Sequence, residues 1–261
     1  MRIFVFVKQV PNTASVEFDP ATGNLLRSGV ESIINPLDLK AIEVALQLKE
    51  KNGGRVTAVS MGPPQAGYVL KRALSMGCDE AVLLSDSLFG GADTLATGYV
   101  LASAVKKLDD YDVLVFGRHA QDAETAQTGA VVASALGIPI SSYVSSAEMS
   151  DGKMVCQRSL TDKTERVRIT LPAAITINSD GPTPRYAKLK DILSIDAKPF
   201  RVWDCSDLKC DPNRVGKNGS PSINKTLFAA ETSVRNTARL STDPEAAAKE
   251  LMSYLVLKQY V

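Results

Sequence analysis

Short apolar segments alternate with helical segments along the first half of the chain, and this alternation constrains the fold more than any other feature. The apolar segments are Arg2–Val7, Val56–Val59, Ala81–Leu84 and Val113–Phe116. Between them, apolar residues recur at the spacing of an amphipathic helix, and glycines such as Gly53 and Gly77 follow. Strands that are almost wholly apolar belong in parallel sheets with helices on both faces. The pattern therefore predicts an α/β fold with a doubly wound, mostly parallel sheet.

The alternation changes after Pro139. Four strand-like segments then follow one another without helices between them: Ser141–Glu148, Lys153–Arg158, Glu165–Leu171 and Ala174–Ile177. Strands joined in this way usually pair antiparallel, so we expect a small antiparallel extension over about 141–178. A further small hairpin is expected over 15–27, where apolar stretches flank a Pro/Gly turn. Together these segments form a predicted nucleotide-binding domain over residues 1–193.

The last part of the chain has a different character. From Ser194 the sequence is polar and interrupted by prolines, and a final amphipathic helix is expected over about Asp243–Leu257. A polar segment of this kind cannot bury itself, so it lies on the body of the protein or on another chain. We expect residues 194–261 to form an extended C-terminal arm and helix that pack on a partner subunit.

Composition excludes several classes of function. Thirty basic and 29 acidic residues leave a net charge of +1, so no overall field attracts nucleic acid. No apolar run reaches the ~18 residues of a membrane helix, and no small-residue cleavage site follows the N-terminal apolar run. The four cysteines have neither C-x-x-C pairs nor metal-ligand spacing, which indicates structural thiols in a reducing compartment. We therefore expect a cytoplasmic protein without a metal site, membrane insertion or a nucleic-acid partner.

The loop after the fourth predicted strand is the strongest candidate for a ligand site. In a doubly wound sheet, ligands bind beyond the carboxyl ends of the strands, where the strand order reverses. Gly117 lets the chain leave the strand, and Asp122 or Thr125 can cap a helix expected over about Ala123–Leu136. The free amides of a helix start bind phosphate, and Arg118 would add a charged contact. An ordinary capped helix start has the same pattern, so this loop alone does not decide between the two interpretations.

Other loops converge on the same predicted edge of the sheet. They are Lys8–Pro11, Asn35–Asp38, Met61–Pro63 and Gly90–Thr97. Each contains Gly or Pro and can present backbone groups to an adenine or a phosphate, so together they favour a nucleotide crevice. Neither a G-x-G-x-x-G motif nor a Walker loop is present. His119, the only histidine, is expected to be a loop residue near the ligand, and we assign no catalytic residue.

Several of these motifs together resemble a known family. They are Val7–Pro11, Ile34–Asp38, Ser60–Ala66, Gly90–Thr97, Gly117–Gly129 and Pro184–Tyr186. In this order they resemble the small (β) subunit of electron-transferring flavoproteins. Two of them, Ser60–Ala66 and Gly90–Thr97, are most similar to the anaerobic, electron-bifurcating branch. The resemblance runs from Met1 to about Pro221 and implies an adenine-nucleotide hydrolase-like fold.

The resemblance implies a heterodimer with a larger, FAD-binding subunit. In the respiratory branch the β subunit holds AMP, whereas in the bifurcating branch the same crevice holds a second FAD that exchanges a hydride with NAD(H). Electrons would then divide between a low-potential acceptor, ferredoxin or flavodoxin, and a flavin-dependent dehydrogenase reached through the large subunit. Two alternatives stay open: a non-bifurcating subunit with structural AMP, and a nucleotide-binding protein of the universal-stress type. Whether the chain is an enzyme in its own right also stays open.

Carried over by position, the resemblance implies a set of cofactor contacts. These are Phe6, Asn35, Pro36, Leu37, Asp38, Met61, Thr94, Thr97, Gly117, Arg118, His119, Ala120, Gln121, Asp122, Ala123, Glu124, Thr125, Ala126, Gln127 and Thr128. Within that set, the amides and hydroxyl around residues 122–128 would hold the phosphates. Thr94 and Thr97 would lie near the flavin end of an FAD, or serve only as residues of a helix start.

The resemblance also implies two partner contacts. A docking loop over about 184–191 would meet partner dehydrogenases through Arg185, Tyr186, Lys188 and Leu189, with Leu189 as the apolar anchor. An exposed leucine among basic residues suits weak, transient docking. Glu165 matches an acidic position that faces the large subunit, although a charge on a strand edge would have the same pattern.

Overall fold

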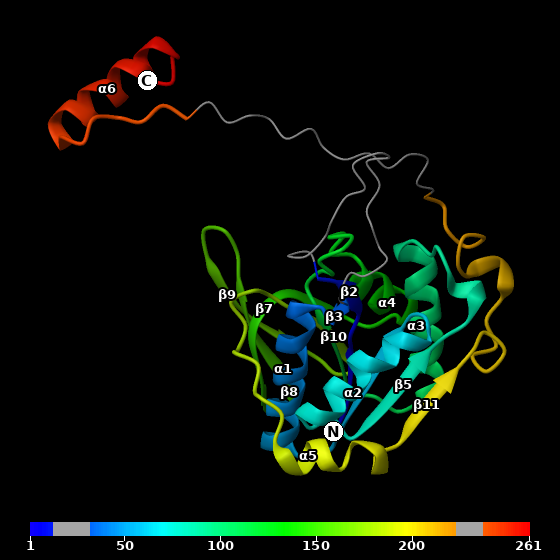
Figure 1. The fold of residues 1–261 in the computed structure, drawn as a ribbon. Coiled ribbons are helices and arrows are strands. Elements are labelled where there is room, and N and C mark those ends of the chain that lie inside the picture. The colour runs from blue at the N-terminus through cyan, green and yellow to red at the C-terminus, as the bar shows by residue number, and fades with distance from the viewer. Residues whose placement is uncertain (13–31, 223–236) are drawn as a thin grey trace. The chain divides into compact units, whose positions relative to one another are not determined.

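The computed structural model describes residues 1–12, 32–222 and 237–261, and the chain divides into two compact units, Met1–Thr226 and Leu227–Val261. The first unit is built on a nine-stranded sheet (Figure 1). In spatial order its strands are β11 (Phe200–Trp203), β5 (Glu80–Leu84), β4 (Arg55–Met61), β1 (Arg2–Phe6), β6 (Val113–Gly117), β10 (Ala173–Ile177), β7 (Ile140–Ser150), β8 (Lys153–Ser159) and β9 (Thr164–Ile169). The hairpin expected over 15–27 lies outside the described residues.

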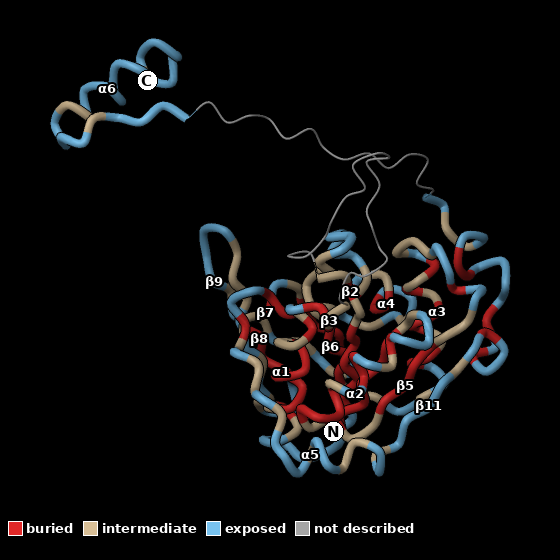
Figure 2. The backbone as a smooth tube through the Cα atoms, in the orientation of Figure 1, coloured by how far each residue is buried: buried red, intermediate tan, exposed pale blue. Residues whose placement is uncertain are grey.

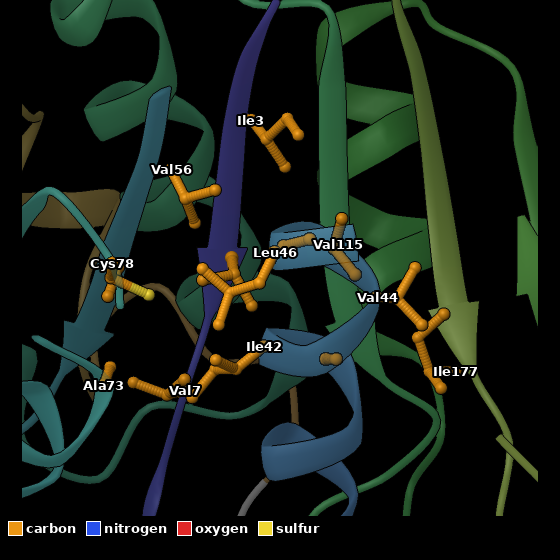
Figure 3. Packing of buried hydrophobic residues seen from close by; sticks show 14 of the residues in the cluster. Ile3, Val7, Ile42, Val44, Leu46, Val56, Ala73, Cys78, Val115 and Ile177 are labelled. Carbon is orange, nitrogen blue, oxygen red and sulfur yellow. The ribbon is translucent and has the colours of Figure 1, made fainter. Parts of the chain in front are cut away.

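Helices cover both faces of this sheet. One face carries α1 (Pro36–Asn52) and α2 (Gly67–Met76), and the other carries α3 (Thr94–Leu108) and α4 (Thr128–Leu136). Each face therefore has its own buried apolar cluster (Figure 2). On the first face, Ile42 of α1 packs in the same cluster as Val7 and Val115 (Figure 3). The predicted doubly wound, mostly parallel fold is confirmed.

Smaller elements complete the two units. β2 (Gln9–Pro11) and β3 (Ser32–Ile34) form a two-stranded antiparallel sheet, and the short helix α5 (Leu189–Leu193) follows β10 in the chain. The second unit contains α6 (Pro244–Leu257), which is capped by Asp243 and agrees with the helix expected there. Nowhere in the described ranges is a helix both long and apolar enough to cross a membrane.

One part of the predicted antiparallel extension is wrong. β7, β8 and β9 pair antiparallel as expected, but β10 runs parallel to both of its neighbours, β6 and β7. All five residues of β10 are buried, whereas β9 has no buried residue. The apolar segment therefore belongs in the middle of the sheet, and the polar one forms its edge. The chain runs outward to the edge of the sheet through β7–β9 and returns to insert β10 between β6 and β7.

The strand β11 has no counterpart in the sequence prediction. Its four residues pair parallel with β5 at the far edge of the sheet. The loop that follows buries Cys205, Leu208 and Val215 in the cluster beneath α3. The first compact unit ends at Thr226, and these isolated apolar residues anchor a polar stretch of the chain to its core.

The strand order reverses beside β1. β4 and β5 lie on one side of β1, whereas the next sheet strand in the chain, β6, lies on the other side. These strands are parallel, so their carboxyl ends share one edge of the sheet. The start of α1 and the loop after β6 meet at this edge. This is the position at which doubly wound folds bind ligands.

Asp38 joins the elements that meet at the reversal. Its buried carboxylate accepts hydrogen bonds from the Lys8 backbone N–H (2.8 Å) and from Asn35 Nδ2 (2.9 Å). Gly117 lies so close that an added Cβ would stand 2.2 Å from Asp38 Oδ1, so a larger residue would push α1 away from β6. Burial raises the pKa of Asp38 to about 7, against the lowering effect of these hydrogen bonds.

We expect the stability of the chain to fall as the pH rises through the pKa of Asp38. The folded pKa of about 7 exceeds the ordinary value of 3.8, so the folded state holds this proton more tightly than the unfolded state. The stabilisation is complete below the ordinary value and is lost as the pH rises through the folded pKa. Urea unfolding from about pH 5 to 8 should show the wild type losing stability relative to Asp38→Asn by up to about 1.4 kcal/mol per pH unit.

An exposed carboxylate supplies the control for this measurement. Asp180→Asn should follow the wild type across the whole pH range, because Asp180 is exposed. A gap between wild type and Asp38→Asn that does not change with pH would contradict the assigned titration.

Candidate functional site

The loop between β6 and α4 differs from its prediction. α4 begins at Thr128 with Gln127 at its N-cap, so the helix start expected near Ala123 is wrong. Glu124 and Ala126 have φ angles of 49° and 54°. This left-handed conformation is incompatible with a continuous right-handed helix. Of the amides around 122–128 that were expected to bind phosphate, those before Thr128 therefore lie in an irregular loop, and only Thr128 belongs to the helix start.

Asp122 and Thr125, the expected caps, precede α4 and cap no helix. Asp122 pairs instead with Lys8, whose Nζ lies 2.6 Å from Oδ2 and 2.9 Å from Oδ1. Because Lys8 follows β1 and Asp122 follows β6, this ion pair spans the point where the strand order reverses. Both side chains are partly exposed, so the Lys8 ammonium is accessible to solvent at this edge of the sheet.

Asn35 holds the same loop against the start of α1. Its buried Nδ2 donates to the His119 carbonyl (2.9 Å) as well as to Asp38, and its Oδ1 accepts from the Gln121 N–H (3.2 Å). Pro36 occupies the first helical position of α1, where its missing N–H costs no hydrogen bond. The predicted contact segments 35–38 and 117–121 therefore form one hydrogen-bonded structure.

Arg118 provides a second cation at this edge. Its Nη1 donates to Asn178 Oδ1 (2.9 Å), its Nε donates to His119 Nδ1 (3.1 Å), and it lies 5.7 Å from the centre of the Tyr143 ring. All three partners are neutral or weakly basic, and the described part of the chain offers the guanidinium no carboxylate partner. Its full positive charge is available to an anionic ligand.

Sequence reasoning missed two of these partners, Asn178 and Tyr143. A usable signal existed for Asn178, because it is the polar residue directly after the buried strand β10. Tyr143 gave no signal, because it lies within β7 and has an unusual φ of 61°.

The start of α4 is open to an anion. No side chain caps it, so the amides of its first turn, from Thr128 to Ala130, have no partner within the helix. An added Cβ on Gly129 would lie 3.0 Å from Thr176 Cγ2 and 3.3 Å from the Phe116 ring. The helix start is thereby held directly against β6 and β10, with its positive dipole end at the carboxyl edge of the sheet. Free amides at a positive dipole end are a suitable site for a phosphate.

Thr94 and Thr97 lie at the start of α3, which adjoins the start of α4. The Thr94 Oγ1 atom is 3.4 Å from Gln127 Oε1. Asp93 caps α3 and accepts hydrogen bonds from two N–H groups of its first turn at 2.9 and 3.0 Å. The Thr97 N–H donates to the Asp93 carbonyl (2.9 Å). A ligand that extends from the α4 start towards α3 would therefore reach threonine hydroxyls.

The ends of β1 and β4 support the site from within the core. The Phe6 ring stacks on Phe116 at 4.2 Å between centroids and is buried beneath α3 and α4. Met61 is partly buried against the same cluster. Beside it, the buried Ser60 hydroxyl has no hydrogen-bond partner in the part of the chain that the structure describes. Sequence reasoning did not single out Ser60 as a site residue.

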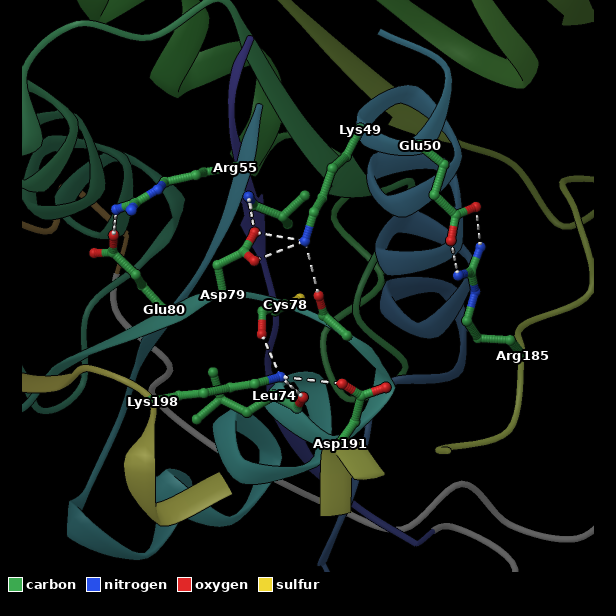
Figure 4. Close-up of polar contacts among 12 residues, drawn as sticks. Lys49, Glu50, Arg55, Leu74, Cys78, Asp79, Glu80, Arg185, Asp191 and Lys198 are labelled. Carbon is green, nitrogen blue, oxygen red and sulfur yellow. Dashed lines mark hydrogen bonds and ion pairs between the residues drawn. The ribbon is translucent and has the colours of Figure 1, made fainter. Parts of the chain in front are cut away.

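Arg185, the first residue of the expected docking set, is anchored to α1. Its Nε donates to Glu43 Oε2 (2.8 Å), and its guanidinium also pairs with Glu50 (Figure 4). Burial opposes ionisation of Glu43, but the Arg185 hydrogen bonds hold its pKa below the usual value. Arg185 is committed to this contact, whereas Tyr186, Lys188 and Leu189 are exposed, and the two apolar side chains Tyr186 and Leu189 are 89% and 71% exposed.

Glu165 lies on the edge strand β9. It pairs with Lys163 (2.9 Å) and with Arg158 (3.2 Å). The hydrogen bond from Lys163 lowers the pKa of Glu165, so the carboxylate is ionised at neutral pH. The structure thus places Glu165 far along the sheet from β11, in an ion-paired row of the β7–β9 extension.

Comparison with known proteins gives one consistent family. Residues 22–208 match the family model described as the electron transfer flavoprotein domain. The electron transfer flavoprotein subunit beta of Clostridium acetobutylicum is 42% identical, over 99% of this chain and 97% of its own. Subunit CarD of the caffeyl-CoA reductase-Etf complex of Acetobacterium woodii is 42% identical over 85% of each chain. The acryloyl-CoA reductase electron transfer subunit gamma of Anaerotignum propionicum is 39% identical, over 85% of this chain and 86% of its own.

The relatives agree with the order of motifs that suggested the resemblance. The family model spans the start of α1, the loop after β6 and the docking segment, and the first of these relatives aligns over nearly the whole chain. A protein of the universal-stress type would not carry this match. The chain belongs to the electron transfer flavoprotein family and is one of its β subunits.

Proposed function

We propose that this chain is the small subunit of a heterodimeric, cytoplasmic electron-transferring flavoprotein that binds FAD at the carboxyl edge of its sheet. NADH is the proposed hydride donor. The proposed electron acceptors are ferredoxin or flavodoxin and, through the FAD of the large subunit, a flavin-dependent dehydrogenase. When bound, FAD supplies hydride and single-electron chemistry that no side chain of this protein offers. The chain itself holds and orients the cofactor.

The uncapped start of α4, which follows the loop that carries Arg118, is the observation that carries this proposal. Free amides and a helix dipole lie at the carboxyl edge of the sheet, and the preceding loop carries a guanidinium without a carboxylate partner in the described part of the chain. A pyrophosphate bound there would accept hydrogen bonds from Thr128 to Ala130. Asn35 contributes by fixing the loop that carries Arg118, and Lys8 can exchange its partner Asp122 for a phosphate oxygen.

The adjoining start of α3 supports FAD over AMP. AMP ends at a single phosphate, whereas FAD continues beyond its pyrophosphate to a second, flavin-bearing half. Thr94, which stands 3.4 Å from Gln127, lies where that second half would continue. Two relatives are named as subunits that serve caffeyl-CoA and acryloyl-CoA reductases, which supports a dehydrogenase partner of this protein that acts on coenzyme A thioesters.

The flavin content of the purified heterodimer tests the cofactor assignment. We expect two FAD molecules per heterodimer, one of them held by this chain, and bleaching of the visible spectrum when NADH is added. Acid release followed by chromatography identifies the nucleotides. One FAD together with one AMP, and no bleaching by NADH, would overturn the assignment of FAD to this crevice.

Replacement of Arg118 tests the phosphate cradle. Arg118→Gln should weaken FAD binding to this chain by roughly tenfold or more, because a charge-assisted hydrogen bond contributes about 1.5–3 kcal/mol. The FAD of the large subunit should be retained, so the flavin count falls from two towards one. Arg166→Gln on the exposed edge strand β9 is the matched control and should leave both flavins in place. An equal loss of flavin from the two variants would show that Arg118 does not bind the cofactor.

Replacement of Leu189 tests the docking loop. Leu189→Ala should lower kcat/KM for electron delivery to the dehydrogenase by about tenfold, since an exposed anchor of this kind contributes about 1–2 kcal/mol when buried by a partner. Val202→Ala, which truncates another exposed apolar residue on β11, should have little effect. The flavin content should be unchanged in both variants, and loss of flavin from Leu189→Ala would contradict a purely docking role.

A further inference from the structure

We propose that the docking segment carries a receptor for a carboxylate side chain of the partner dehydrogenase, formed by Lys188 and Lys190 at a small cavity beside Leu189. The inference rests on the proposed docking function and adds the chemistry of the partner surface. A dehydrogenase that fits must offer an apolar pocket for the leucine and an acidic side chain next to it.

The segment that presents these residues is fixed at both ends. Arg185 binds Glu43 and Glu50 of α1 at its start. At its other end, Lys198 Nζ donates to the carbonyls of Leu74 (2.8 Å) and Cys78 (2.9 Å) (Figure 4). These two anchors restrict the arrangements that the residues between them can adopt before a partner arrives. Preorganisation of this kind reduces the entropy lost on docking.

A cavity of about 150 Å³ lies between this segment, the second half of α1 and the end of α2. Its charged lining consists of Lys49, Glu50, Arg185, Lys188, Lys190 and Asp191. Four of these side chains are cationic and two are acidic, so the cavity carries a positive charge. Binding sites for whole small molecules measure roughly 300–1,000 Å³. This cavity is smaller than that range and suits a single side chain.

The charges around the cavity are not balanced internally. Lys49 lies 2.7 Å from Asp79, Glu50 is taken by Arg185, and Asp191 lies 3.7 Å from Lys198 (Figure 4). Each acidic group near the cavity thus already lies beside a cation, and Glu43 and Glu50 share Arg185.

Lys188 and Lys190 are the lining cations that have no such partner among the described residues. Within the described residues neither ammonium has a carboxylate within 4.0 Å, and both side chains are exposed. Two unpaired cations at a preformed hollow attract a carboxylate, and the resulting pair would be partly desolvated when the partner covers it.

Exposed apolar side chains surround this receptor. Tyr186, Leu189 and Leu193 are 89%, 71% and 78% exposed, although the segment that bears them is rigidly anchored. Large apolar side chains held out into solvent next to unpaired lysines are typical of a protein interface with an apolar centre and a charged rim. We therefore commit to a protein carboxylate as the occupant, and a free anion becomes an outcome of the test.

Charge reversal in the assembled heterodimer tests the receptor. The variant Lys188→Glu/Lys190→Glu should lower kcat/KM for reduction of a purified flavin-dependent acyl-CoA dehydrogenase at least tenfold at about 20 mM salt. The loss should shrink at about 300 mM salt, where charges are screened over ~6 Å. The control Lys106→Glu/Lys153→Glu makes the same change in net charge on α3 and β8, and should change kcat/KM less than threefold.

Carbodiimide cross-linking identifies the occupant directly. With the acyl-CoA dehydrogenase present, mass spectrometry should find isopeptide bonds from Lys188 or Lys190 to one acidic segment of that enzyme. These bonds should disappear in Lys188→Gln/Lys190→Gln. Equal losses of activity in the reversal variant and its control, protection from cross-linking by inorganic phosphate alone, or cross-links only to other lysines would each overturn the receptor.

The same experiments separate this inference from the docking proposal on which it rests. If Leu189→Ala slows electron delivery at all salt concentrations but Lys188→Glu/Lys190→Glu does not, the docking role of the loop is supported and the carboxylate receptor is wrong. If neither substitution affects electron delivery, the docking assignment itself fails.

Discussion

The contact between Gly117 and Asp38 is the constraint on which the rest of the site depends. Glycine at the end of β6 allows the start of α1 to pack closely against the strand. A Cβ atom added to Gly117 would lie only 2.2 Å from Asp38 Oδ1, so no larger residue fits there without a shift. That approach brings Asn35 within hydrogen-bond distance of the loop after β6. The loop in turn presents Arg118 and leads to the uncapped start of α4. One missing side chain thus sets the shape of the whole carboxyl edge.

The molecule keeps its two proposed activities apart. The proposed nucleotide site lies at the carboxyl edge of the sheet, where α1 and α4 begin. The docking segment lies near the end of α1 and the end of α2, at the side of the N-terminus (Figure 1). Because the two sites share no residue, cofactor binding and partner choice can change independently. This separation suits an electron carrier that keeps one cofactor and serves different dehydrogenases.

Local sequence signals predicted the elements that depend on local chemistry. Pro36 stands at the start of α1 and Asp93 caps α3, and both signals can be read from the sequence because capping and proline geometry act over a few residues. The start of α4 could not be predicted in this way. Its displacement to Thr128 depends on left-handed conformations at Glu124 and Ala126, which neither residue type favours and which the surrounding contacts must impose.

Elements that depend on distant contacts were the least predictable. The parallel pairing of β10 follows from its place between β6 and β7, and hydrophobicity alone does not encode that order. The partners of Arg118 come from β7 and from the end of β10, far along the chain. In contrast, the convergence of the strand-end loops needed only the parallel topology, and the alternation of strands and helices was sufficient to predict it.

The most direct measurement of the central claim is a structure of the assembled heterodimer with its nucleotides bound. We predict that the pyrophosphate lies against the first-turn amides of α4, Thr128 to Ala130, and that the Arg118 guanidinium contacts a phosphate oxygen. A nucleotide bound elsewhere on the chain, with the α4 amides left to water, would contradict it.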